Sequence, residues 1–156
     1  MNEGDTPKVR IVPPLVYLAG LVIGHVLNGW LPAAAEGLPV RAAWIAGALL
    51  VLLGLGLSAS AMINFRRSGT TIRPDRAATS LVIAGPYKFT RNPMYVGLAI
   101  AYLGLAIADR SLPSLVLLPV VLLIIRHAAI AQEEAFLERR FGSAYTDYKA
   151  RVRRWL

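Results

Sequence analysis

Long apolar stretches alternate with polar segments along the chain. The four apolar stretches cover residues 11–31, 42–63, 94–108 and 112–131. A helix needs about 20 apolar residues to cross the hydrocarbon of a bilayer, so these lengths are typical of membrane helices, although the third stretch is short. The polar turn Asp109-Arg110-Ser111 predicts a tight helical hairpin between the last two stretches. The pattern therefore predicts one all-α domain, a membrane bundle of four transmembrane helices.

Two polar regions accompany these helices, the connection 64–93 and the C-terminal region 132–156. Gly and Pro residues punctuate the connection around the apolar run Leu81-Val82-Ile83, which predicts an ordered loop lying on the bundle. Apolar residues at helical spacing between 132 and 141 predict a C-terminal amphipathic helix at the membrane interface. Aromatic residues of this region are expected at headgroup depth, namely Tyr145, Tyr148 and Trp155.

Small residues recur at a spacing of four within the apolar stretches. The pairs are Gly20 and Gly24, Gly54 and Ser58, Gly56 and Ser60, and Gly97 and Ala101. Such spacing lets helix backbones approach closely in lipid, where apolar side chains gain little from contacting one another. The pairs therefore predict a closely packed bundle.

Composition and charge add to this interpretation. The chain is 56% hydrophobic and contains no cysteine, which excludes disulfides, thiolate metal sites and cysteine nucleophiles. Its net charge is +8, but the basic residues flank the apolar stretches, so membrane lipids are the expected partner and nucleic acid is not. Lys and Arg are frequent in 64–93 and 132–156 and rare in 32–41, which predicts cytoplasmic termini and a cytoplasmic connection.

The hairpin connects two polar segments that lie far apart in the sequence. Arg91 precedes its first helix, and Glu133 and Glu134 follow its second. Because a helical hairpin returns its two ends to one membrane surface, we expect the cation and the acids to meet there. A charged site at the mouth of an apolar bundle suits chemistry that joins a polar reagent to an apolar one.

The residues around this expected site have a recognisable pattern. It consists of Gly85-Pro86-Tyr87, Arg91-Asn92-Pro93-Met94-Tyr95, Gly97, Glu133-Glu134, Leu137, Phe141-Gly142, Tyr145 and Tyr148. In these residues the chain resembles the isoprenylcysteine carboxyl methyltransferase family, small integral-membrane enzymes related to the phospholipid N-methyltransferases. Ser68-Gly69-Thr70 and Arg73-Pro74 are similar to its bacterial branch, which implies a bacterial inner membrane. Many members have His where this chain has Asn92, which cannot carry a proton in neutral water, so no acid–base role is expected there.

The resemblance implies an S-adenosylmethionine-dependent methyltransferase whose lipophilic acceptor enters from the bilayer. It implies no metal, and it places the cofactor between the connection 64–93 and the region 132–156. The implied catalytic residues are Arg91, Asn92 and Glu134, and the implied cofactor-binding residues are Tyr87, Arg91, Asn92, Pro93, Tyr95, Glu133 and Glu134. Arg91 can bind the cofactor carboxylate by two charge-assisted hydrogen bonds, while Glu133 or Glu134 can accept from its ammonium or ribose. His127 and Arg151 are expected to contact the substrate.

Other interpretations of the same residues stay open at this stage. Arg91 and Asn92 also fit an interfacial anchor before a helix that starts at Pro93, and Arg151, Arg153 and Arg154 fit contacts with lipid phosphates. The acceptor can be a prenylated cysteine carboxylate, the amine of phosphatidylethanolamine, or a small thiol or phenol. A non-enzymatic scaffold or transporter partner is the alternative of another class, whereas a nicotinamide enzyme lacks its glycine fingerprint. The oligomeric state is left open.

Overall fold

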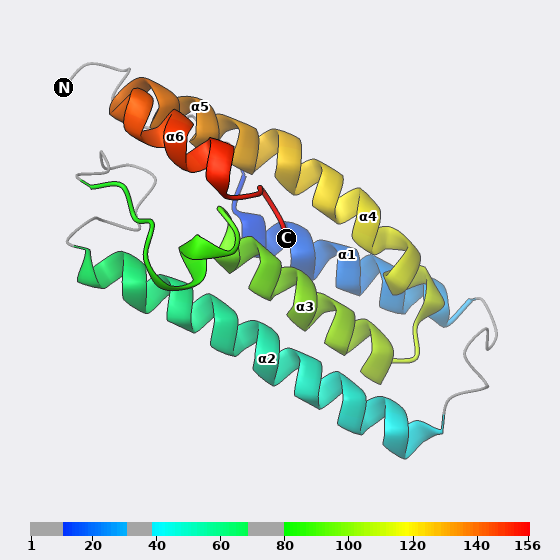
Figure 1. Ribbon diagram of the computed structural model, residues 1–156. Helices are drawn as coiled ribbons and strands as arrows, with labels where there is room; N and C mark the ends of the chain where they lie inside the picture. Colours follow the sequence, from blue (N-terminus) through cyan, green and yellow to red (C-terminus); the bar gives the residue numbers. More distant parts are fainter. Residues whose placement is uncertain (1–10, 31–38, 69–79) are drawn as a thin grey trace.

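The computed structural model describes residues 11–30, 39–68 and 80–156 of the chain. Helices make up most of these residues, and the described ranges contain no β-strand. The elements are α1 (Pro13–Asn28), α2 (Val40–Arg67), the 3₁₀-helix η1 (Gly85–Lys88), α3 (Pro93–Ala108), α4 (Leu112–Ile125), the π-helical turn η2 (Arg126–Ile130), α5 (Ala131–Phe141) and α6 (Ser143–Arg151) (Figure 1). The all-α prediction is confirmed.

Two helices of the described part are long and apolar enough to cross a membrane. They are α2, with 28 residues, and the continuous helix Leu112–Phe141, with 30 residues. The apolar helices α1 and α3 have 16 residues each. At 1.5 Å per residue each is about 24 Å long, short of the roughly 30 Å of hydrocarbon. Two of the four expected spans therefore have full length, and the first helix is shorter than the predicted stretch 11–31.

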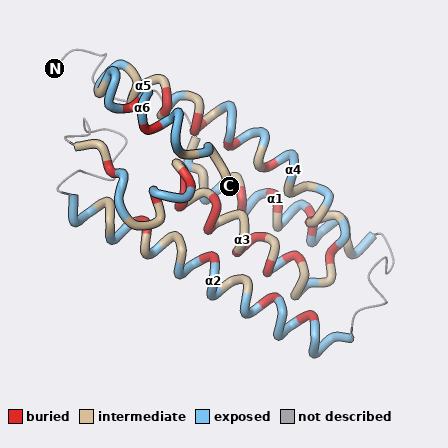
Figure 2. The backbone as a smooth tube through the Cα atoms, viewed as in Figure 1, coloured by how far each residue is buried: buried red, intermediate tan, exposed pale blue. Residues whose placement is uncertain are grey.

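Apolar side chains cover much of the outer surface of these helices. Figure 2 shows mainly exposed positions along α2 and on the outer face of α4. Examples are Leu18, Leu52 and Val116, which are 55%, 68% and 64% exposed. Soluble monomers rarely expose apolar surface on this scale. The outer surface is that of a membrane protein.

The packing of α2 against α3 depends on glycines. A Cβ atom on Gly104 would lie 2.6 Å from the carbonyl oxygen of Gly47, and one on Gly47 would lie 2.5 Å from that of Gly104. Gly54 and Gly97 form a second close approach between the same helices. The predicted close packing is confirmed there, whereas a Cβ on Gly56 would meet nothing within 4 Å. Gly56 thus lies off the contact face.

The turn between α3 and α4 is tight, as predicted, and defines the turn end of the bundle. Ser111 caps α4 by accepting from the Ser114 amide at 3.2 Å. Its hydroxyl also donates to the carbonyl oxygen of Gly24 at 3.1 Å. Nearby, His25 Nδ1 lies 2.9 Å from an oxygen of Asp109. These contacts fasten the end of α1 to the hairpin turn.

The second arm of the hairpin is longer than the sequence predicts. Residues 132–141 do not form a separate surface helix, because α4, η2 and α5 are continuous from Leu112 to Phe141. After Pro119, which lies inside α4, no Gly or Pro interrupts the chain before Gly142. Gly142 has a φ of +53°, a conformation that favours glycine, and it lets α6 turn back beside α5 (Figure 1).

The aromatic residues of α6 are buried inside the protein. Tyr145 is 1% exposed and Tyr148 is 5% exposed, so their rings pack inside the protein and do not face the lipid headgroups; their depth in the membrane stays a prediction. The Tyr148 hydroxyl donates to the carbonyl oxygen of Tyr87 at 2.7 Å, which joins α6 to η1. Trp155 is partly buried and packs against the core between α1, α3 and α4. The C-terminal region thus belongs to the folded core.

The described part of the connection, residues 80–92, lies on the bundle as predicted. Val82 and Tyr87 are buried against Ala61, with Phe65 and Met94 packed around them. The expected bacterial-branch residues in 69–79 lie outside the described residues. The connection therefore adds its own small core at the end of α2.

One end of the bundle, called here the site end, collects several helix termini. The Tyr17 hydroxyl near the start of α1 donates to the Tyr95 carbonyl oxygen at 3.0 Å. The Ser58 hydroxyl of α2 donates to the Met94 carbonyl oxygen at 3.1 Å. The start of α3 is thus fixed between α1 and α2, and η1, α5 and α6 surround it (Figure 1).

Candidate functional site

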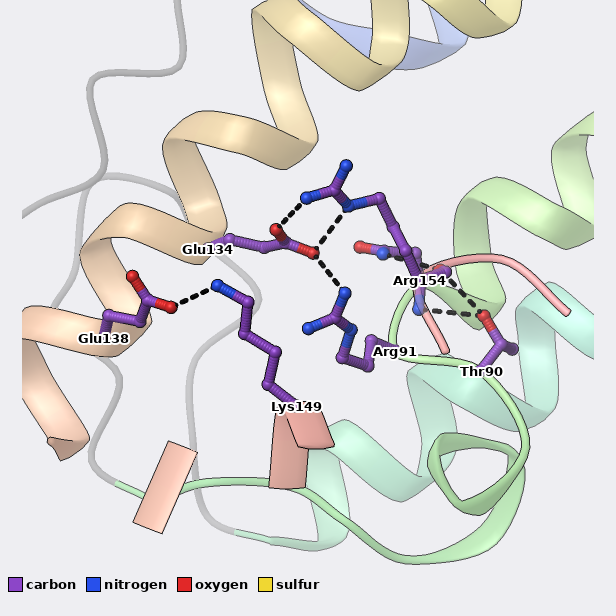
Figure 3. A network of polar contacts seen from close by, with 7 residues as sticks. Thr90, Arg91, Glu134, Glu138, Lys149 and Arg154 are labelled. Atoms are coloured by element: carbon purple, nitrogen blue, oxygen red, sulfur yellow. Dashed lines mark hydrogen bonds and ion pairs between the residues drawn. The ribbon is translucent and has the colours of Figure 1, made fainter. Parts of the chain in front are cut away.

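Arg91 and Glu134 meet at the site end (Figure 3). Arg91 stands two residues before α3, which begins at Pro93, a residue suited to the first helical position. Glu134 lies on α5, at the far end of the hairpin's second arm. Arg91 Nη2 is 3.2 Å from Glu134 Oε1, and each side chain is 8% exposed. The structure thus brings together the cation and one of the acids that the hairpin was expected to join.

A second guanidinium contacts the same carboxylate. Arg154 Nε donates to Glu134 Oε1 at 3.0 Å, and Arg154 Nη2 donates to Oε2 at 2.6 Å. This two-point geometry is the strong form of an arginine–carboxylate contact. The hydrogen bonds to Glu134 raise the pKa of Arg154, so its charge is secure. Figure 3 shows Arg91 and Arg154 converging on Glu134 from different segments.

The backbone of the C-terminal tail fastens to the segment that carries Arg91. The Arg91 amide donates to the Arg153 carbonyl oxygen at 2.9 Å. The Thr90 hydroxyl and the Asn92 side-chain amide donate to the Arg154 carbonyl oxygen at 3.1 Å and 2.9 Å. Thr90 and Asn92 are 2% and 8% exposed. Asn92 therefore holds the tail in place, a role that needs no proton transfer.

Arg91 keeps donors that no described residue uses. Its Nε and Nη1 atoms are buried and have no hydrogen-bond partner. A buried unpaired donor costs about 1–3 kcal/mol, and more when it is charged. Arg91, Arg154 and Glu134 together carry two positive charges and one negative charge, a net charge of +1. The arrangement suits an anionic ligand, whose oxygens can accept charge-assisted hydrogen bonds from these donors.

Comparison with known proteins places the chain in a family. A family model described as phospholipid methyltransferase matches residues 42–144. The chain belongs to the phospholipid methyltransferase family. The match includes Arg91 and Glu134 and ends before Arg154.

Two curated relatives are similar to this chain. The nickel-cobalt-cadmium resistance protein NccN of Alcaligenes xylosoxydans xylosoxydans is 30% identical over 144 residues, which cover 92% of this chain and 60% of NccN. An uncharacterized protein of Haemophilus influenzae is 36% identical over 63 residues, 40% of this chain and 79% of that protein. The chain thus spans about 60% of the length of NccN. No solved structure matches it.

In this member of the phospholipid methyltransferase family, Glu133 lies beside the cluster of Arg91, Arg154 and Glu134. It has a hydrogen-bond partner of its own. The Tyr95 hydroxyl donates to Glu133 Oε1 at 2.5 Å. Tyr95 is on the first turn of α3, and its carbonyl oxygen also accepts from Tyr17. The predicted residues Glu133 and Tyr95 thus contact each other, next to the Arg91–Glu134 pair.

The other predicted site residues have different surroundings. Tyr87 and Pro93 are buried, and the Tyr87 ring lies 6.4 Å from that of Phe65, between centroids. His127 is exposed on η2. Arg151 is exposed and donates to the Asp147 carbonyl oxygen within α6 at 3.1 Å. No hydrogen bond or ion pair joins these four side chains to the Arg91–Glu134 pair in the described part of the chain. Burial and the nearby charges of Tyr148 and Glu133 raise the pKa of Tyr87, so Tyr87 lies near the site. The functional roles of the four residues stay predictions.

Arg154 is the site residue that the sequence did not single out. It was grouped with Arg151 and Arg153 as a contact for lipid phosphates. Three arginines within four positions give no signal that separates one from another. The chain leaves the helical conformation after Arg151, with Val152 extended, and this change of backbone decides which arginine faces Glu134.

Proposed function

We propose that the protein is an S-adenosylmethionine-dependent membrane methyltransferase acting on a lipophilic acceptor that enters from the bilayer. The observation that carries the proposal is that two buried nitrogens of Arg91, Nε and Nη1, are unpaired beside two acids. Arg91 lies at one end of a bundle with an apolar outer surface. Membership of a methyltransferase family supports the reaction class.

The chain's residues fit the polar groups of this cofactor. Arg91 offers its unpaired nitrogens to the cofactor carboxylate. Glu133 is better placed than Glu134 to accept from the ammonium or the ribose, because both oxygens of Glu134 already contact arginines. When bound, the cofactor supplies a methyl group on a positively charged sulfur. The protein's task is then to orient the reactants and exclude water, since in-line displacement depends mainly on positioning.

The orientation in the membrane follows from the basic residues. The site end carries Arg66, Arg67, Lys88, Arg139, Arg140, Lys149, Arg151 and Arg153 besides the cluster itself. The positive-inside rule favours a cytoplasmic site end, with both termini on that side of a bacterial inner membrane. A soluble cofactor then arrives from the cytoplasm and the acceptor from the bilayer.

Two acceptor classes fit this arrangement. A carboxylate acceptor of the isoprenylcysteine type needs no base, whereas the ammonium of phosphatidylethanolamine must first lose its proton. The amine of phosphatidylethanolamine is kept as the alternative acceptor, because the matching family model is that of phospholipid methyltransferases.

A labelling experiment tests the activity and identifies the acceptor. The purified protein in nanodiscs made from a bacterial lipid extract is incubated with methyl-labelled S-adenosylmethionine, and the lipids are analysed by mass spectrometry. We expect label in a lipid or lipophilic product, and loss of labelling in Arg91→Ala but not in the exposed Arg139→Ala. Label on ethanolamine phospholipids would identify the alternative acceptor. Equal labelling by wild type and Arg91→Ala would contradict the proposed site.

A further inference from the structure

The two contacts that Glu134 makes are unequal. Arg154 engages both carboxylate oxygens, at 3.0 and 2.6 Å. Arg91 reaches one oxygen through a single nitrogen, Nη2, at 3.2 Å. An isolated arginine–carboxylate pair tends to form two parallel hydrogen bonds. Because Arg154 engages both carboxylate oxygens of Glu134, Arg91 is left with a single contact.

We infer that Arg154 is a positioning residue that keeps Nε and Nη1 of Arg91 free for an anionic group of the ligand. The inference rests on the proposed function and adds a residue to its site. The ligand group is a carboxylate or a phosphate, since the oxygens of both accept charge-assisted hydrogen bonds from a guanidinium. The source is the amino-acid part of the cofactor or the headgroup of a phospholipid.

The charge balance supports the same role. With Arg154 present, two guanidinium charges face the carboxylate of Glu134, and these three groups have a net charge of +1, Glu133 beside them not included. Without Arg154, the remaining Arg91–Glu134 pair is neutral. Its carboxylate is then free to turn and engage a second nitrogen of Arg91. Removal of Arg154 thus weakens anion binding twice, by loss of charge and because Glu134 then occupies a second nitrogen of Arg91.

The fold holds Arg154 in this position through its backbone. Its carbonyl oxygen accepts from Thr90 and Asn92, the two neighbours of Arg91. Trp155, the next residue, packs against the core. The tail is therefore fixed to the very segment whose arginine it positions, and a change of the Arg154 side chain leaves these backbone contacts in place.

The experiment compares variants of Arg154 with three probes, by titration calorimetry of nanodisc-embedded protein. Arg154→Gln removes the charge, Arg154→Lys keeps it, and Arg139→Gln is the same change at an exposed arginine of α5. The probes are S-adenosylhomocysteine, its decarboxylated analogue S-adenosyl-3-thiopropylamine, and a short-chain phosphatidylethanolamine. Thermal unfolding of each variant verifies that it is folded.

We expect Arg154→Gln to weaken binding of S-adenosylhomocysteine by about tenfold or more, with little change for the decarboxylated analogue. Arg154→Lys should recover part of the loss, and Arg139→Gln should change neither probe. Adding Arg154→Gln to Arg91→Ala should cost no further affinity, because the nitrogens that Arg154 keeps free are then absent. If Arg154→Gln does not fold, Arg154→Lys carries the test, with a smaller loss confined to the carboxylate-bearing probe.

The outcomes separate this inference from the proposed function. If wild type binds the phospholipid but not S-adenosylhomocysteine, the proposed cofactor fails. The inference then stands if Arg154→Gln weakens binding of the phospholipid by about tenfold. Equal weakening for S-adenosylhomocysteine and its decarboxylated analogue would overturn the inference, as would unchanged affinity in the Arg154 variants. Binding of none of the three probes by wild type would overturn it as well.

Discussion

The Arg91 guanidinium lies 3.2 Å from the Glu134 carboxylate, although the whole α3–α4 hairpin separates the two residues in the sequence. The hairpin itself produces this contact. Its first arm begins just after Arg91, and its second arm returns as one continuous helix that carries Glu134. Arg154 then reaches the same carboxylate from the tail. Charges from three segments thus converge where the bundle's apolar surface ends.

Glu134 is expected to stabilise the fold as well as the site. Glu134→Gln leaves the guanidiniums of Arg91 and Arg154 close together without their anion, and Arg91 is only 8% exposed. Removal of one partner from a buried ion pair costs about 3 kcal/mol or more. The control is Glu138→Gln. The side chains of Glu138 and Lys149 are 38% and 40% exposed, and an ion pair this exposed contributes about 0–1 kcal/mol. Thermal unfolding in detergent should show a much larger decrease for Glu134→Gln, and equal decreases would contradict this account.

Asn92 is expected to act through the C-terminal tail. Asn92→Leu has a similar size but removes the hydrogen bond to the Arg154 carbonyl oxygen, which costs about 1 kcal/mol of stability. The Arg91 amide, which donates to Arg153, should then exchange its hydrogen faster in mass-spectrometric hydrogen-exchange measurements. Thr146→Val removes an exposed hydroxyl contact and serves as the control. Unchanged exchange at Arg91 in Asn92→Leu would show that the tail is held by other contacts.

The close approach of α2 and α3 makes a further prediction. Gly104→Ala places a Cβ atom 2.6 Å from the Gly47 carbonyl oxygen, a backbone atom that cannot move alone. We expect a loss of about 1–3 kcal/mol of stability from this overpacking. Gly56→Ala meets nothing within 4 Å and should be neutral or stabilising by about 0.5–1 kcal/mol, as alanine favours helix. Thermal unfolding measures the stability of both variants. Similar unfolding temperatures would argue against the close packing of α2 against α3.

Tyr148 gives the stability a dependence on alkaline pH. Burial raises the pKa of Tyr148 to about 12 from 10.0, although the nearby charge of Arg91 lowers it in part. The unfolded chain releases this proton first, so the stabilisation is complete below pH 10 and is lost as the pH rises towards 12. Burial likewise raises the pKa of Tyr87 and Tyr145. Tyr148→Phe should make the unfolding temperature fall less steeply between about pH 10 and pH 12. An unchanged slope would assign the loss of stability to other groups.

The sequence predicted the parts of this structure that depend on local pattern. The apolar stretches and the three-residue turn predicted the hairpin, and the hairpin predicted that Arg91 and Glu134 share one end. Glycine spacing predicted close helix packing, and the structure shows it where Gly54 approaches Gly97. Each of these features follows from helix geometry within one or two neighbouring segments.

Features that depend on long-range packing were missed. Residues 132–141 have the pattern of a surface helix, but that pattern also fits a helix that continues α4 while its polar side chains contact a tail. Tyr145 and Tyr148 fit a membrane interface as well as a core, and the turn at Gly142 decides for the core. Arg154 faces Glu134 because the backbone becomes extended after α6, a change that three neighbouring arginines do not reveal.

The central claim is that Arg91 holds the carboxylate of the methyl donor through nitrogens that Glu134 leaves free. Calorimetric titration of the nanodisc-embedded protein with S-adenosylhomocysteine tests it most directly, with Arg91→Ala measured beside wild type. We expect saturable binding by wild type and a decrease of roughly 10- to 150-fold in Arg91→Ala, with its unfolding temperature nearly unchanged because Glu134 keeps Arg154. Equal affinity of the two proteins, or no binding by folded wild type, would contradict the claim.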